Sequence, residues 1–107
     1  MMKAMISQPM RGKTNEQIRK ERATVVKKLQ EKGFEVIDTI ISENLPEGID
    51  EPIYYLSKSI EFISKVDFVY FMKGWENARG CKIENLICVE YSKAIIYEES
   101  EENKNEK

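Results

Sequence analysis

Two segments of this 107-residue chain carry side chains that could do chemistry. The first, MISQPMRGKT at residues 5–14, ends in Gly-Lys-Thr and follows a short apolar run, as a phosphate-binding P-loop does. A P-loop requires Gly-x-x-x-x-Gly-Lys-Thr, but Ser7 stands at the first glycine position. Pro9, inside the loop, has no N–H to offer a phosphate. The segment is therefore not a P-loop.

The same segment can form a different anion site. If it leaves a parallel strand, it lies at the carboxyl edge of the sheet, where α/β proteins bind their ligands. Gly12 lets the backbone approach a ligand closely, Arg11 offers a forked cation, and a helix N-terminus is expected just beyond. The alternative is an ordinary strand–helix turn with a solvated arginine, and composition alone favours that alternative.

The second segment, FVYFMKGWENARGCKIENLICVEY at residues 68–91, places an acid just inside a predicted helix. Gly80 permits a tight turn, and Glu84 follows in about the first helical turn, where the dipole favours the ionised carboxylate. Cys81, Glu84 and Cys88 share one helix face at spacings of three and four. A carboxylate is unusual on such a face, because charged groups are seldom buried without purpose. The alternative is a glutamate that stabilises the helix dipole from solvent.

The chain contains no histidine, which removes Ser-His-Asp and Cys-His catalysis and every histidine-ligated metal site. Nucleophilic or acid–base work then falls to carboxylates, tyrosines, lysines or a tuned thiol, and carboxylate chemistry is the simplest. Cys81 and Cys88 are predicted to be small buried side chains and not nucleophiles. Trp75 is predicted either to line a pocket or to cap the edge of the core. No metal and no cofactor are predicted.

Composition narrows the class of protein. An apolar content of 41% and a charged content of 34% are typical of a soluble globular domain. The net charge of −2 argues against a nucleic-acid polymer as partner, and no apolar run approaches the roughly 18 residues of a membrane span. Without a secretion signal, and with two cysteines outside any disulfide framework, the chain is expected in the cytoplasm.

Apolar clusters alternate with helical patterns along the chain. Thr14 and Gln17 form a capping-box pattern that starts the first helix, and Gly33 ends it. In the second helix, Leu56, Ile60 and Ile63 are predicted to face inward. The predicted strands are 3–7, 34–37, 66–72 and 93–97, the helices 15–32, 53–65 and 81–91, the loop 38–52 and the turn 73–80.

The order βαβαβαβ predicts four parallel strands joined by right-handed crossovers, in a small three-layer sandwich. Residues 1–97 are expected to form this single domain, and the acidic tail 98–107 to be disordered, because it has nothing to bury. Four strands with three helices leave one face of the sheet thinly covered. We therefore expect a homo-oligomer, a dimer or higher.

The segments MISQPMRG and DFVYFMKGWENARGCKIE together resemble a family of small bacterial and phage proteins related to nucleoside 2-deoxyribosyltransferases. The likeness runs from the first strand to the fourth. It implies a flavodoxin-like fold with strand order 2-1-3-4, association as dimers or higher, and cleavage of the N-glycosidic bond of deoxynucleosides. The relatives' nucleophilic glutamate, four residues after a glycine, corresponds to Glu84 after Gly80.

The resemblance also implies a binding site for a nucleoside or nucleotide. Glu84 would stabilise or trap the positive charge that develops at C1′ of the sugar. The loop from Ser7 to Gly12 resembles the phosphate loop of the related 2′-deoxynucleoside 5′-phosphate N-hydrolases, and Trp75 could stack on the base. The substrate-binding residues predicted in this way are Ser7, Gln8, Pro9, Met10, Arg11, Gly12, Trp75, Arg79 and Gly80.

Three positions depart from the relatives. Met5 replaces a tyrosine of the first strand, Ser59 an acidic residue before the central strand, and Ala78 a serine or aspartate before the glycine. The group that protonates the leaving base is not assigned. These departures favour a second hypothesis, in which the protein binds a nucleotide or a nucleotide-derived signal without cleaving it. A third is an interaction or assembly protein with a vestigial pocket.

Overall fold

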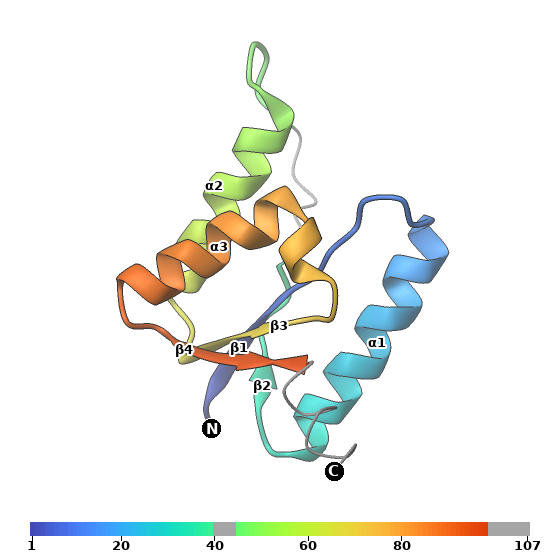
Figure 1. Ribbon diagram of the computed structural model, residues 1–107, viewed down its shortest axis with the longest axis vertical. Coiled ribbons are helices and arrows are strands. Elements are labelled where there is room, and N and C mark those ends of the chain that lie inside the picture. The colour runs from blue at the N-terminus through green and yellow to red at the C-terminus, as the bar shows by residue number, and fades with distance from the viewer. Residues whose placement is uncertain (40–44, 99–107) are drawn as a thin grey trace.

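A parallel sheet of four strands forms the middle of the molecule (Figure 1). The computed structural model describes residues 1–39 and 45–98. The strands are β1 (Lys3–Ser7), β2 (Glu35–Val36), β3 (Phe68–Phe71) and β4 (Ala94–Tyr97), in the order β2-β1-β3-β4. The other elements are α1 (Asn15–Glu31), α2 (Glu51–Ile63), the short 3₁₀ helix η1 (Trp75–Asn77) and α3 (Arg79–Glu90). The predicted parallel, flavodoxin-like α/β fold is confirmed.

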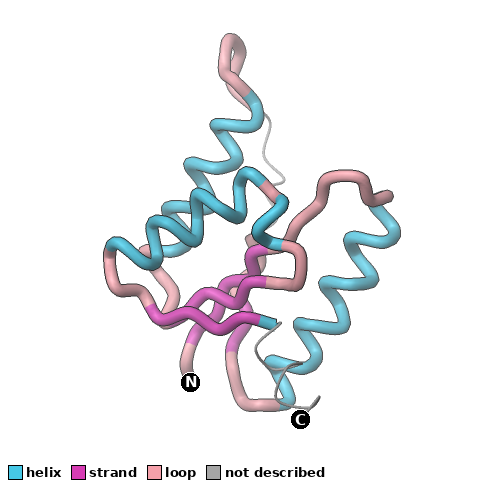
Figure 2. The backbone as a smooth tube through the Cα atoms, viewed as in Figure 1, coloured by secondary structure: helices cyan, strands magenta, loops and turns pink. Residues whose placement is uncertain are grey.

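Helices cover both faces of the sheet, α1 on one side and α2 with α3 on the other (Figures 1 and 2). Alternate residues of a strand point to opposite faces, so the two inner strands carry apolar side chains on both faces, at Ala4 to Ile6 of β1 and along β3. The core under α1 consists of Ala4, Ile6, Val25, Leu29, Phe68, Tyr70 and Met72. The core under α2 and α3 consists of Met5, Ile63, Val66, Val69, Phe71 and Cys88.

The two inner strands end side by side, with Ser7 of β1 in register with Phe71 of β3. From this point the chain leaves in opposite directions, because α1 packs on one face of the sheet and α3 on the other (Figure 1). Such a topological switch point leaves a crevice beyond the carboxyl ends of the strands, where ligands bind in open α/β sheets.

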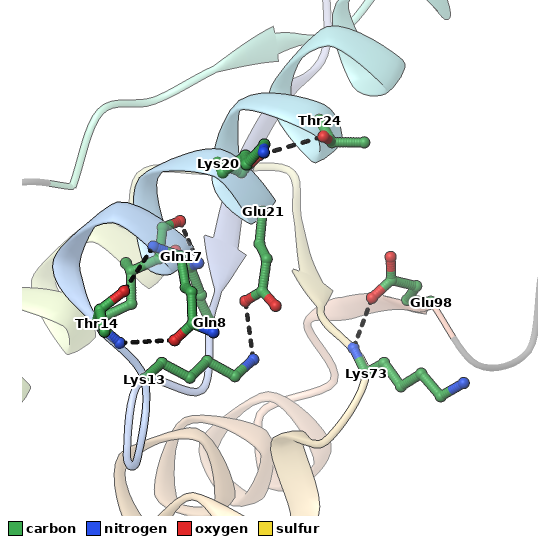
Figure 3. Close-up of polar contacts among 10 residues, drawn as sticks. Gln8, Lys13, Thr14, Gln17, Lys20, Glu21, Thr24, Lys73 and Glu98 are labelled. Carbon is green, nitrogen blue, oxygen red and sulfur yellow. Dashed lines mark hydrogen bonds and ion pairs between the residues drawn. The ribbon is translucent and has the colours of Figure 1, made fainter.

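α1 begins where the capping-box pattern predicts (Figure 3). The Thr14 hydroxyl accepts a hydrogen bond from the Gln17 backbone N–H at 3.1 Å, and the Thr14 N–H donates to the Gln17 side chain at 2.8 Å. The helix ends at Glu31, one residue before its predicted end. Gly33 follows with a positive φ of 89°, as its predicted role as a helix stop requires.

Replacing Thr14 by alanine is expected to destabilise the protein by about 0.5–2 kcal/mol, because a backbone N–H at the start of α1 loses its acceptor. Thr24→Ala is the matched control: Thr24 lies on an exposed part of the same helix, and its loss is expected to change stability by no more than about 0.5 kcal/mol. Urea denaturation of the three proteins measures both effects. Equal losses in the two variants would show that the capping box does not stabilise the fold.

α2 begins at Glu51, two residues before its predicted start. The Asp50 carboxylate caps it by accepting a hydrogen bond from the Ile53 N–H at 3.2 Å, and proline is tolerated in the first turn because its missing N–H needs no partner there. The prediction that Ile60 faces inward is wrong, since its side chain is 37% exposed. Ile63 is buried, as predicted.

The segment 73–80 is not one turn as predicted. It contains η1, and α3 begins at Arg79, two residues before the predicted start. Gly80 is therefore helical, and the left-handed turn falls at Gly74, whose φ is 91°. The predicted positions of the other three strands hold, but each is one to three residues shorter than the pattern suggests.

Two predicted segments lie partly outside the described residues, namely the loop 38–52 through residues 40–44 and the tail 98–107 through 99–107. At the start of the tail, Glu98 accepts a hydrogen bond from the Lys73 N–H at 2.7 Å (Figure 3). Within residues 1–39 and 45–98, no helix is long and apolar enough to cross a membrane.

Candidate functional site

An open cavity of about 790 Å³ lies at the switch point of the sheet. Its walls come from the end of β1, the β1–α1 loop, α1, α2 and the start of α3. The volume falls within the roughly 300–1,000 Å³ that is typical of small-molecule sites. Arg11 and Glu84 both line it, so the two segments that the sequence singles out meet at one cavity.

Most of the predicted binding residues line this cavity, but Pro9, Gly12 and Trp75 do not. Trp75 instead stacks on Tyr97, with ring centroids 5.4 Å apart, and joins the core cluster beneath α3. Of its two predicted placements, the structure therefore shows the one at the edge of the core. The predicted residues at the cavity are Ser7, Gln8, Met10, Arg11, Arg79, Gly80 and Glu84.

Glu84 is the sixth residue of α3, and only 7% of it is exposed. The Ser7 hydroxyl donates a hydrogen bond to its Oε1 at 2.5 Å, and the Ser59 hydroxyl is a second hydrogen-bond partner. Burial raises the pKa of the carboxyl above its ordinary value, and the two serine hydrogen bonds oppose this rise only in part. The net direction is therefore opposite to the one that the helix dipole alone would give. Glu84 lies in the second turn, where the dipole has little effect.

The two thiols flank this carboxyl on one face of α3, as the spacing predicts. Burial raises the pKa of both Cys81 and Cys88 to about 11, and the neighbouring Glu84 charge adds to the effect. Both are therefore thiols near neutral pH, and their predicted burial is confirmed. Cys81 also lines the cavity, next to Ser7.

Four arginines line the cavity, and sequence reasoning found two of them, Arg11 and Arg79. Arg19 and Arg22 were not predicted. They lie three residues apart on α1, and they line the cavity together with Ile18 of the same helix. Arg22 is half-buried and donates a hydrogen bond to the Thr39 hydroxyl at 3.3 Å. Burial lowers its pKa, and attraction to Asp38 opposes that shift.

Among the other lining residues, the sequence marks Met5, Ser59 and Ala78 only as positions that depart from the relatives, and it gives no clear signal for the rest. Tyr55 and Ser59 reach the cavity only because α2 folds beside α3, and Thr39 because the chain after β2 passes along the opening. The full set of lining residues that the binding prediction did not include is Met5, Ile6, Ile18, Arg19, Arg22, Thr39, Tyr55, Ser59, Ala78 and Cys81.

Gln8 connects the loop after β1 to α1 (Figure 3). Its side-chain N–H donates to the Ile18 backbone carbonyl at 2.7 Å, and only 7% of the residue is exposed. This bond fixes the first part of the loop that carries Arg11 against the helix that carries Arg19. Its buried carbonyl oxygen has no hydrogen-bond donor among the described residues.

Because burial raises the pKa of Glu84, folding favours its protonated form. The resulting stability is fully present below the ordinary value of 4.5 and is lost as pH rises through the folded-state pKa. Glu84→Gln keeps the shape without the charge, so above that range the variant is expected to be more stable than the wild type, by about 0.5–2 kcal/mol. Urea denaturation at pH 4.5 and pH 8 measures the difference, which should grow with pH.

Glu90→Gln provides the control for this pH dependence. Glu90 is the exposed last residue of α3, and its variant should not reproduce the gain in stability expected of Glu84→Gln at pH 8. A Glu84→Gln effect that is the same at pH 4.5 and pH 8 would contradict the raised pKa.

No three His, Cys, Asp or Glu side chains of the described residues come together in a way that could hold a metal ion. In a comparison with protein families, residues 2–97 match the model of one described as "Domain of unknown function (DUF4406)". That range includes all four strands and all three α-helices. No curated protein and no solved structure matches the chain.

Proposed function

The chain belongs to the family described as Domain of unknown function (DUF4406), and for this member we propose cleavage or transfer at the N-glycosidic bond of a nucleoside or nucleotide. The observation that carries the proposal is the position of Glu84, a buried carboxyl at an open cavity that arginines surround. The segments around Ser7 and Glu84 resemble the nucleoside 2-deoxyribosyltransferases, and this resemblance is the reason for proposing the N-glycosidic bond as the bond that is cleaved.

In the proposed reaction the Glu84 carboxylate attacks C1′ of the sugar. A bond from its oxygen to C1′ forms while the C1′–N bond breaks, and the base leaves with the bonding electron pair and takes up a proton from water. Attack of water or of a second base on C1′ then releases the carboxylate. This is the two-step logic of retaining glycosidases.

The neighbouring groups supply orientation. The Ser7 and Ser59 hydroxyls hold the carboxyl in one position, since both hydrogen-bond to it. Arg11, at the other segment, would bind a 5′-phosphate through a forked pair of hydrogen bonds. Binding energy from that remote group would then fix C1′ against the carboxylate.

A binding protein without turnover is the second candidate, and one observation favours it. The three positions that depart from the relatives, Met5, Ser59 and Ala78, all line the cavity. The altered positions therefore share a cavity with the carboxyl that the proposed reaction uses, and Ser59 stands where the relatives carry a second acid.

One experiment tests both candidates. The protein is incubated with the common deoxynucleosides and with their 5′-phosphates, and free base is measured by chromatography. Release of a base that depends on Glu84 supports the enzyme. Calorimetric binding with an unchanged ligand selects the binding protein, and the absence of base release from every compound would rule out the proposed reaction.

The proposal includes a homo-oligomer, a dimer or higher. Its support is a set of apolar side chains that the described part of the chain leaves in solvent on α2 and α3, among them Ile53 at 64%, Leu86 at 57% and Val89 at 56% exposed. A cytoplasmic location and the lack of a nucleic-acid polymer partner stay predictions.

A further inference from the structure

The cavity carries more positive charge than one phosphate needs. Its described lining contains four arginines, Arg11, Arg19, Arg22 and Arg79, and a single carboxyl, that of Glu84. Even with this carboxyl ionised the balance is positive, and burial biases Glu84 toward its neutral form. A phosphate monoester brings a charge of about −1.5 to −2 near neutral pH, which leaves part of the arginine charge without a counterion.

Three of these arginines come from α1 and from the loop that leads into it. Arg19 and Arg22 are separated by three residues on α1, which makes them neighbours on the helix surface. Arg11 lies on the loop that leads into the same helix. Like charges at this spacing repel one another, and a bound anion would relieve that repulsion. An arrangement of adjacent guanidinium groups suits adjacent phosphates, since each guanidinium can hold a phosphate by two parallel hydrogen bonds.

Among the described residues, the partners of these arginines leave most of their positive charge available to a ligand. Arg22 has the Thr39 hydroxyl and the attraction of Asp38. Arg11 and Arg19 form no ion pair with any residue in the described ranges 1–39 and 45–98. By contrast, Lys13 of the same loop is paired with Glu21 of α1 at 2.8 Å (Figure 3), and neither residue lines the cavity.

We propose that the cavity takes a nucleotide with two linked phosphates, a nucleoside 5′-diphosphate or an ester of one, with the phosphates held on the wall of Arg11, Arg19 and Arg22. This inference rests on the proposed function for the position of the sugar, which lies at Glu84. The cavity volume of about 790 Å³ is in the upper part of the range for small-molecule sites and leaves room for the second phosphate.

Titration calorimetry with matched ligands tests the proposal. The ligands are the 5′-mono- and 5′-diphosphates of the four common deoxynucleosides, together with inorganic phosphate and inorganic pyrophosphate. The diphosphate is expected to bind at least about tenfold more tightly than the monophosphate of the same nucleoside, the gain from one further charge-assisted hydrogen bond. Pyrophosphate is expected to bind more tightly than phosphate, and it contains no glycosidic bond that turnover could consume.

Arginine variants test whether Arg19 and Arg22 cause the tighter binding of the diphosphate. In Arg19→Gln and in the double variant Arg19→Gln/Arg22→Gln, the preference for the diphosphate is expected to shrink to less than about threefold. Arg19 is exposed, so the single variant tests the wall even if the double variant does not fold. Lys27→Gln removes one positive charge from the exposed side of α1, outside the cavity, and should keep the full preference.

Equal affinity for mono- and diphosphates would overturn the inference. So would a preference that survives the arginine variants, or no binding of any of the ligands. The outcome is separate from that of the proposed reaction. If the protein prefers the diphosphate but releases no base, the proposed reaction is wrong and the diphosphate inference holds. If it releases base from monophosphates but does not prefer the diphosphate, the reaction holds and the diphosphate inference is wrong.

Discussion

Glu84→Gln is expected to reduce the release of free base by at least about 10³-fold, which is within the range that loss of a nucleophile costs in other enzymes. The physical reason is that an amide oxygen carries no charge with which to form the ester to C1′ or to stabilise the charge that develops there. The side chain keeps its shape, and its amide oxygen can still accept the hydrogen bond that Ser7 donates to Glu84. Chromatography of the released base over time measures the rate.

Two observations separate this chemical loss from a general loss of structure. Glu90→Gln, at the exposed end of the same helix, should release base at the wild-type rate. In the wild type, release should increase with pH as the Glu84 carboxyl ionises, over a range above its ordinary value of 4.5, because burial raises its pKa. If Glu84→Gln releases base at more than a tenth of the wild-type rate, Glu84 is not the nucleophile.

Phe71→Ala is expected to cost about 3–5 kcal/mol of stability, which is the usual effect of emptying a phenylalanine site in a core. Phe71 is the last residue of the central strand β3 and is fully buried. Its ring lies against those of Trp75 and Tyr97, with centroid distances of 5.5 and 5.8 Å. The three rings come from three separate elements and cannot close around a cavity without moving the sheet, so little relaxation can reduce the loss.

Tyr91→Ala removes a ring of similar size from the surface and serves as the control, since Tyr91 is 82% exposed. Its stability should change by no more than about 0.5 kcal/mol. Denaturation by urea at constant pH compares the two variants with the wild type. A loss below about 1.5 kcal/mol for Phe71→Ala would show that the aromatic cluster repacks and does not hold the end of β3 rigidly.

The parts of the fold that the sequence predicts best are those with strong local signals. β1 is predicted to the residue, and α1 begins where the Thr14 capping box places it. The starts of α2 and α3 are misplaced by two residues each. The pattern of the 38–52 segment does not mark Asp50 as a helix cap, and Gly80 suggests a turn although glycine is also tolerated near a helix start.

In the candidate site, too, the residues with a local sequence pattern are predicted, and those placed by long-range packing are not. The two segments with Arg11 and Glu84 have recognisable patterns, and parallel-sheet topology is enough to expect them at one edge. Arg19 and Tyr55 depend on how α1 and α2 stand around the cavity, which no local pattern encodes. The direction of the Glu84 pKa shift depends on tertiary burial, which the position of Glu84 along its helix does not reveal.

The hydrogen bond between Ser7 and Glu84 joins residues 77 positions apart in the chain. It exists only when β1 lies in its native register beside β3, because a slip of one residue would turn the Ser7 side chain to the opposite face. The cavity is therefore absent from any partly folded intermediate in which the N-terminal strand has not yet docked. A compound that fills it would recognise only finished molecules, and by mass action would protect the whole domain against proteases and heat.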